Sequence, residues 1–79
     1  MDIIKALELI VKYQTMPALN YAVNYAKAAL QMDVTSEKFR VQMLYLVGNI
    51  SNWRATQAYD VTKEQIQQAR AAIKAAGKS

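Results

Sequence analysis

The side chains of this chain that could carry acid–base or metal chemistry are six carboxylates, because the sequence contains no histidine and no cysteine. Those two residue types usually supply proton transfer near neutral pH, thiolate nucleophiles and transition-metal ligands. The carboxylates are Asp2, Glu8, Asp33, Glu37, Asp60 and Glu64. All but Glu8 lie at expected helix starts, where capping and the helix dipole account for a negative charge. The sequence therefore predicts a protein that is not an enzyme and that holds no metal or cofactor.

A stripe of basic side chains follows the last expected helix. Lys63, Gln67, Arg70, Lys74 and Lys78 recur at helical spacing, so they share one face. Such a face could follow the phosphates of DNA or RNA, since cations that contact phosphate release counterions. It could equally be an ordinary solvated face, because the chain has no arginine cluster, glycine-rich phosphate loop or helix-turn-helix spacing. Nucleic-acid binding through Lys63, Arg70, Lys74 and Lys78 is therefore the alternative interpretation.

The net charge of +4 lies entirely in the second half of the chain. Residues 1–39 carry four lysines and four carboxylates, whereas residues 40–79 carry six cations and two carboxylates. This asymmetry is a mild indication of an acidic partner.

A tyrosine stripe on the second expected helix is the leading candidate for a contact surface. Tyr21 lies four residues before Tyr25, and Met32 continues the same side of the helix. Tyrosine is over-represented among interface hot spots. For the rings themselves, the favoured interpretation is that both lean over the edge of the core with their hydroxyls in water, which is common in small domains; the interface contact is the functional alternative.

Trp53 and Arg54 form a second candidate surface, at the end of the third expected helix. An exposed Trp–Arg pair would be a binding anchor. A buried Trp53 would instead close one end of the molecule, with Arg54 available to stack on it. Burial is the favoured interpretation, because a small domain usually needs its one tryptophan for the core.

Four helices are expected to position these residues, at about 3–13, 17–32, 36–52 and 62–76. Two related segments, DVTSEKF at residues 33–39 and DVTKEQI at residues 60–66, each predict a helix start. Asp2, Thr35 and Thr62 are the expected N-caps of the first, third and fourth helices, and Gln65 completes a capping box with Thr62. Pro17 suits the first position of the second helix, and Gly77 predicts the end of the last one.

The third helix is expected to be central, because apolar residues occupy most of its faces. Gly48 within it would be tolerated if a neighbouring backbone packed close there. Residues 53–61 are ambiguous between a loop and a partly helical segment. With no strand-like alternation and no hairpin dipeptide, the sequence predicts an all-α, compact four-helix bundle-like single domain of residues 1–79 with short connections.

Residues 41–54 (VQMLYLVGNISNWR) resemble a signature of small phage and prophage proteins. In those proteins an apolar helix is followed by asparagine, then by Trp-Arg, then by a second, charged helix. Glycine often follows the arginine there, whereas this chain has Ala55. The resemblance covers about residues 39–74 and belongs to all-helical proteins of generally unassigned function. It implies a viral or mobile-element origin and action by binding a host or viral protein.

The sequence thus predicts a small non-enzymatic protein–protein interaction module, a phage-derived modulator of a host or viral protein. The predicted contact residues are Tyr21, Tyr25 and Met32, with Trp53 and Arg54 as a second patch. The alternatives are the nucleic-acid binder and a structural or assembly component of a phage, and homodimer formation is left open. The longest apolar run is far below the ~18 residues of a membrane span. We therefore expect no membrane partner and a cytoplasmic location, in the host cell if the protein is phage-derived.

Overall fold

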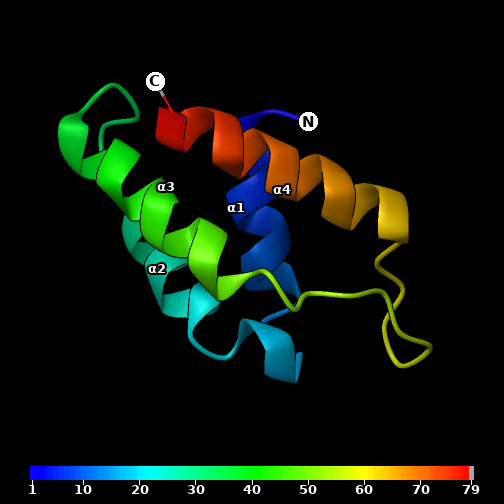
Figure 1. Cartoon of the computed structure of the whole chain (residues 1–79). Coiled ribbons are helices and arrows are strands. Elements are labelled where there is room, and N and C mark those ends of the chain that lie inside the picture. The colour runs from blue at the N-terminus through cyan, green and yellow to red at the C-terminus, as the bar shows by residue number, and fades with distance from the viewer. Residues whose placement is uncertain (79) are drawn as a thin grey trace.

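Four α-helices and one turn of 3₁₀-helix form the protein in a computed structural model that describes residues 1–78 (Figure 1). The α-helices are α1 (Ile3–Lys12), α2 (Ala22–Ala29), α3 (Glu37–Asn49) and α4 (Lys63–Lys78), and the 3₁₀ turn η1 (Pro17–Leu19) precedes α2. No strand occurs within residues 1–78. The Cα radius of gyration is 11.4 Å, close to the ~11.6 Å expected for a compact chain of this length. The all-α prediction is confirmed.

The four helices pack as a ring of neighbours. α1 packs against α2 and α4, and α3 packs against the same two helices. α3 and α4 run antiparallel, since Arg40 at the start of α3 reaches Gly77 and Arg70 of α4 reaches Ile50 beyond the end of α3. The expectation that this third helix is central is therefore wrong. One side of α3 faces outward, and its apolar side chains there are exposed.

The core is filled from every α-helix, from η1 and from the segment that follows α3. Its largest fully buried side chains are Leu7, Ile10, Leu19, Met43, Leu46, Ile50, Trp53 and Ile73. None of the helices in residues 1–78 combines the length and the apolar character that crossing a membrane requires.

Side-chain caps begin three of the helices, and two of these caps are as predicted. Asp2 accepts a hydrogen bond from the Lys5 backbone N–H at 2.9 Å. The Gln65 backbone N–H donates to the Thr62 hydroxyl at 3.1 Å, and the Thr62 backbone N–H donates to the Gln65 side chain at 2.9 Å. This reciprocal pair satisfies two otherwise unpaired backbone donors, so the predicted capping box is confirmed.

The cap of α3 differs from the prediction. Ser36, rather than Thr35, accepts the hydrogen bond from the Phe39 backbone N–H, at 3.2 Å. Thr35 instead donates to the Asp33 carboxylate, from its backbone N–H at 2.9 Å and from its hydroxyl at 2.7 Å. This Asx turn competes for the threonine, so the helix begins one residue later.

The boundaries of the other elements also depart from expectation. Residues 17–32 do not form one helix, because the chain turns at Asn20 and Tyr21 between η1 and α2. α3 ends at Asn49, and residues 53–61 contain no helix. α4 continues through Gly77, which has no positive φ and lies against Leu44 of α3. Gly77 therefore permits a close approach of two helices instead of ending one.

Residues 50–62 form the longest connection, a loop held against the end of α1. The Tyr13 hydroxyl donates a hydrogen bond to the Asp60 carboxylate. The Tyr13 and Tyr59 rings meet edge to face, with centroids 6.2 Å apart, and the Tyr59 and Thr15 hydroxyls are 3.0 Å apart. These contacts fix the loop without a helical turn.

Candidate interaction site

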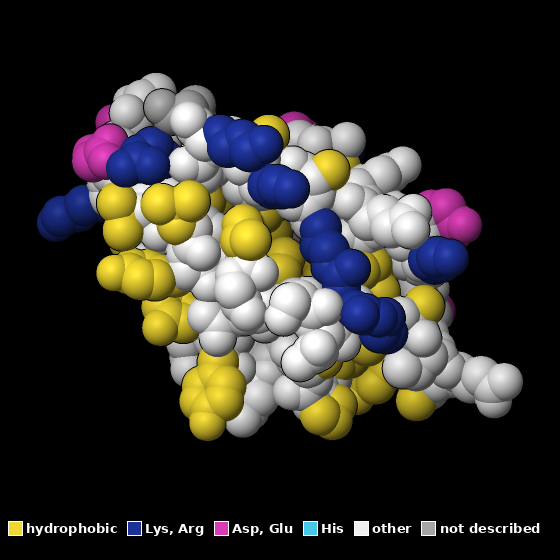
Figure 2. Space-filling view, in the orientation of Figure 1, with side chains coloured by type: hydrophobic (Ala, Val, Ile, Leu, Met, Phe, Trp, Pro, Cys, Tyr) yellow, Lys and Arg dark blue, Asp and Glu magenta, His cyan; other side chains and the backbone are white. Residues whose placement is uncertain are grey.

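An outward face of α3 carries exposed apolar side chains. Leu44, Tyr45 and Val47 are 48%, 55% and 37% exposed. These side chains project from one side of α3. Around the helix axis, Gly48 lies between Leu44 and Tyr45. Figure 2 shows hydrophobic side chains gathered along the left flank of the molecule, where α3 lies in Figure 1. Contiguous exposed apolar patches on small proteins commonly mark interaction sites.

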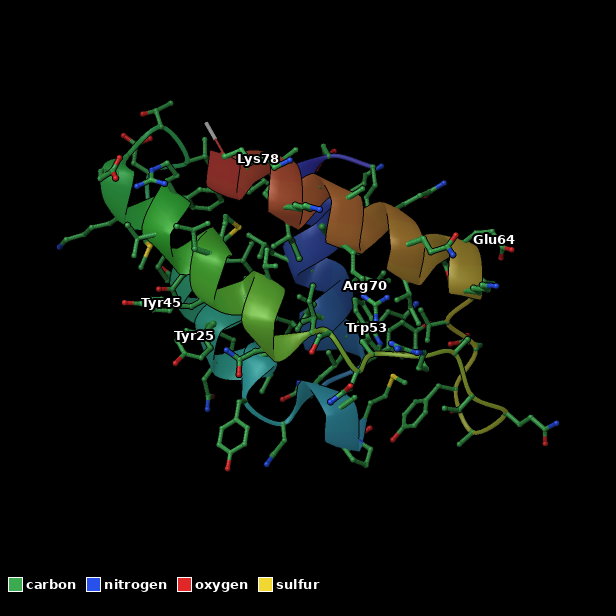
Figure 3. All side chains as sticks on the ribbon, viewed as in Figure 1. Tyr25, Tyr45, Trp53, Glu64, Arg70 and Lys78 are labelled. Carbon is green, nitrogen blue, oxygen red and sulfur yellow. The ribbon has the colours of Figure 1, made fainter. Side chains whose placement is uncertain are left out.

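Tyr25 of α2 extends this surface. Its ring lies 5.8 Å from the ring of Tyr45, measured between centroids, with the planes tilted by 31°, and Figure 3 shows the two side by side. Tyr25 is half-buried against the core, and its backbone carbonyl accepts a hydrogen bond from the Gln42 side chain at 3.0 Å. We call Tyr25, Leu44, Tyr45 and Val47 the apolar face.

The sequence-predicted stripe on the second helix falls partly within this surface. Tyr21 is 72% exposed and lies one turn before Tyr25, in the turn that precedes α2. Met32 lies beyond the end of α2 and is half-buried against the core. Sequence reasoning missed Leu44 and Tyr45. The available signal was that apolar residues surround α3 on more sides than neighbouring helices can cover.

Gly48 leaves a flat area on the exposed side of α3. A Cβ atom built on Gly48 would have no heavy atom within 4 Å. The close packing of a neighbouring backbone that would offset the cost of Gly48 is therefore not found within residues 1–78. A glycine on an open helix face lets another backbone approach closely.

Trp53 is a core residue and not an exposed anchor. Its side chain is fully buried, and its indole Nε1 has no hydrogen-bond partner. Arg54 is exposed and donates to the backbone carbonyls of Ser51 at 2.8 Å and Trp53 at 3.1 Å. Of this predicted pair, only Arg54 is available at the surface. Trp53 is buried and closes one end of the molecule.

Arg70 belongs to the helix packing more than to a free basic face. It donates from Nε to the carbonyl of Ile50 at 3.2 Å, and from Nη2 to the carbonyls of Ser51 and Trp53. Burial, and secondarily the charge of Arg54, lower the pKa of Arg70. These bonds cap the carboxyl end of α3, where the helix dipole favours a cation.

The other cations of α4 remain exposed. Lys63, Lys74 and Lys78 lie along the helix, and Figure 2 shows Lys and Arg side chains as a dark blue row across the face that carries α4. A small pocket of about 100 Å³ joins this row to the apolar face, since Val47 and Ile50 line it together with Arg70 and Lys74. Apolar and cationic surfaces therefore adjoin along the contact between α3 and α4.

Asp2, Asp33, Glu37 and Asp60 each have a hydrogen-bond partner close by in the fold. Within residues 1–78 no group of three or more His, Cys, Asp or Glu could hold an ion. Hydrogen bonds from Thr35 lower the pKa of Asp33, and those from Arg40 lower the pKa of Glu37. Asp60, which the sequence places at a helix start, accepts a hydrogen bond from the Tyr13 hydroxyl, and this bond lowers the pKa of Asp60.

Comparison with protein-family models, with curated proteins and with solved structures gives no match for this chain. The resemblance of residues 39–74 to small phage proteins therefore stays a prediction.

Proposed function

We propose that this protein is a non-enzymatic protein–protein interaction module and that the apolar face is its contact surface. The observation that carries the proposal is the exposure of Leu44, Tyr45 and Val47 on one helix, continuous with the Tyr25–Tyr45 ring pair. Covering a large apolar side chain fully is worth roughly 1.5–3 kcal/mol. A partner that covers this face therefore gains free energy that the isolated chain leaves unused.

The charges around the apolar face favour an acidic partner over a second copy of this chain. Residues 38–59 and 65–79 contain no carboxylate. Lys74 and Arg70 border the pocket beside Val47. A symmetric dimer through this face would bring two copies of a surface without carboxylates together, so neither copy would offer an acidic side chain to the cations of the other. A partner helix with apolar residues flanked by acidic ones would complement both surfaces.

The resemblance of residues 39–74 to phage proteins is the basis for proposing that the partner is a host or viral protein in the cytoplasm. Because Arg70 is committed to capping α3, the nucleic-acid alternative rests chiefly on Lys63, Lys74 and Lys78. A structural role in a phage particle would require self-assembly, which sedimentation velocity measures directly.

The test compares Leu44→Ser with Val34→Ser, because both wild-type side chains are 48% exposed and Val34 lies outside the apolar face. A partner is first captured from lysate with and without nuclease treatment, identified by mass spectrometry and purified. Titration calorimetry then measures its affinity. We expect Leu44→Ser and Tyr45→Ser to weaken binding at least tenfold, which is about 1.4 kcal/mol, and Val34→Ser to leave it unchanged.

Circular dichroism controls for folding in all three variants. Equal losses in Leu44→Ser and Val34→Ser, or no loss in either, would show that the apolar face is not the contact surface. Retained material that disappears with nuclease treatment would favour the basic residues of α4. If the sedimentation coefficient of the protein alone rises with its concentration, and Leu44→Ser abolishes this rise, a second copy of the chain is the occupant of this face.

A further inference from the structure

A separate pocket lies where residues 53–55 pass the first turns of α4. Its volume is about 390 Å³, and its lining includes Trp53, Arg54, Lys63, Ile66, Gln67 and Arg70. Figure 3 shows Trp53 and Arg70 next to each other at this end of the molecule. The pocket shares no residue with the apolar face, so what it binds is independent of the proposed function.

Three cations line this pocket, and no carboxylate does. The ion pair found in residues 1–78 joins Arg40 to Glu37 and lies elsewhere, near the start of α3. Arg54 and Arg70 are close enough for one charge to act on the other. The carbonyls at the end of α3 offset part of this charge, because both guanidinium groups donate to Ser51 and Trp53. Lys63 is outside that arrangement, so the pocket retains an excess of positive charge.

Hydrogen-bond donors in the pocket also remain unused. Arg70 bonds through Nε and Nη2, which leaves its Nη1 unpaired, and Arg54 bonds through Nη1, which leaves Nε and Nη2 unpaired. Neither Lys63 nor Gln67 has a side-chain partner among the described residues. The free Nε and Nη2 of Arg54 make a two-donor edge suited to an oxyanion.

We propose that this pocket binds a phosphate group. A carboxylate has two oxygens in one plane, which the free edge of Arg54 alone would satisfy. The donors of Arg70, Lys63 and Gln67 come from a different element and would remain unpaired. A phosphate monoester offers three terminal oxygens and a charge of about −1.5 to −2 at neutral pH. It therefore matches both the number of free donors and the excess charge.

Trp53 makes the proposal directly measurable, because it is the only tryptophan of the chain and lines the pocket. Inorganic phosphate is titrated into the full chain at constant ionic strength, with sodium chloride replaced in step, and tryptophan fluorescence is recorded. We expect a saturable change in the millimolar range. Arg54→Gln and Lys63→Gln should each weaken it at least fivefold. Lys74→Gln removes the same charge from α4 outside this pocket and should change it less than twofold.

Amide chemical shifts give a second readout that does not depend on the indole. Adding phosphate should shift the amide signals of residues 53–55 and 63–70, and the midpoint of this titration should equal the midpoint of the fluorescence titration. No saturable change, or equal weakening by Lys74→Gln and Arg54→Gln, would overturn the proposal in favour of diffuse screening. A short single-stranded oligonucleotide forms the second arm. If the oligonucleotide binds, and Arg54→Gln weakens this binding while Lys74→Gln does not, the phosphate source is nucleic acid. If inorganic phosphate binds and the oligonucleotide does not, the source is a small molecule.

Discussion

At the scale of single residues, the contact between Tyr13 and Asp60 ties the loop to α1 across 47 positions of the sequence. Accepting the hydrogen bond from Tyr13 lowers the pKa of Asp60, and the charge of Lys12 adds to the effect. The same bond raises the pKa of the Tyr13 phenol. The folded state therefore prefers an ionised carboxylate and a neutral phenol at this contact.

Linkage gives the sign of the resulting pH dependence. A lowered pKa in the folded state contributes stability above the unfolded value, about 3.9 for aspartate, and that contribution is lost as the pH falls through the lowered pKa. The raised pKa of Tyr13 contributes stability below pH ~10 that is lost in more alkaline solution. We expect Tyr13→Phe to be less stable than wild type at pH 7, with the difference shrinking below pH ~4.

Thermal unfolding followed by circular dichroism at pH 7 and at pH 3 tests this expectation. Thr35→Val is the matched control, because it removes a hydroxyl bonded to a different carboxylate, Asp33, without touching the loop. Protection of the amides of residues 59–61 from hydrogen exchange should fall in Tyr13→Phe and not in Thr35→Val. An unchanged stability difference at both pH values would show that the bond contributes nothing through the charge of Asp60.

At the scale of the elements, α3 and α4 are locked in register by two arginines. Arg40 of α3 donates to the Gly77 carbonyl at the end of α4, at 3.3 Å, and Arg70 of α4 caps the end of α3. Arg40 thus bonds a carbonyl in the last turn of α4, which has no partner further along that helix, and Arg70 bonds carbonyls of the residues just beyond α3. This reciprocal capping engages most of the guanidinium donors of Arg40 and Arg70, so the basic half of the chain offers fewer free donors than its composition suggests.

The two glycines of these helices predict opposite responses to alanine. Gly48 has no neighbour at its Cβ position, whereas a Cβ on Gly77 would lie 3.1 Å from the Leu44 Cδ2 atom. Gly48→Ala should therefore stabilise the protein by about 0.5–1 kcal/mol through helix propensity. Gly77→Ala should gain less, because Leu44 must move. Urea unfolding of both variants measures the difference; a larger gain for Gly77→Ala would contradict this packing.

At the scale of the whole molecule, four short helices enclose one core, and Trp53 of the long connection closes it. A chain of this size has a free energy of unfolding of roughly 4–12 kcal/mol. Truncating a buried tryptophan to alanine typically costs about 3–5 kcal/mol. A single side chain from a loop thus carries a large fraction of the stability of the fold.

Trp53→Ala is accordingly expected to lower the free energy of unfolding, measured by urea titration, by about 3–5 kcal/mol. Trp53→Phe should cost much less, because it keeps an aromatic ring in the core and removes the indole N–H that has no hydrogen-bond partner. Tyr45→Ala is the surface comparison and should change stability by less than about 1 kcal/mol. A cost below 1 kcal/mol for Trp53→Ala would mean that the side chain does not close the core.

The sequence by itself determined the all-α class and the features that depend on neighbouring residues. Asp2 and the Thr62–Gln65 pair cap their helices as predicted, since these bonds join residues three positions apart. Tyr21 was identified as a candidate contact from its spacing and is exposed. Bonds of this kind join close neighbours in the chain, so distant packing hardly alters them; the exception is the cap of α3, which a competing local turn moves from Thr35 to Ser36.

Only the tertiary structure decided which apolar and charged side chains are free. α3 is apolar on several sides, so its sequence does not say that Leu44 and Tyr45 face outward. Nor does the stripe on α4 reveal that Arg70 is held by carbonyls about 20 positions away. By sequence, residues 53–61 are compatible with a loop or a partial helix, and contacts of Tyr59 and Asp60 with Thr15 and Tyr13 hold them as a loop with turns. Each outcome depends on partners distant in sequence, which periodicity along one segment does not encode.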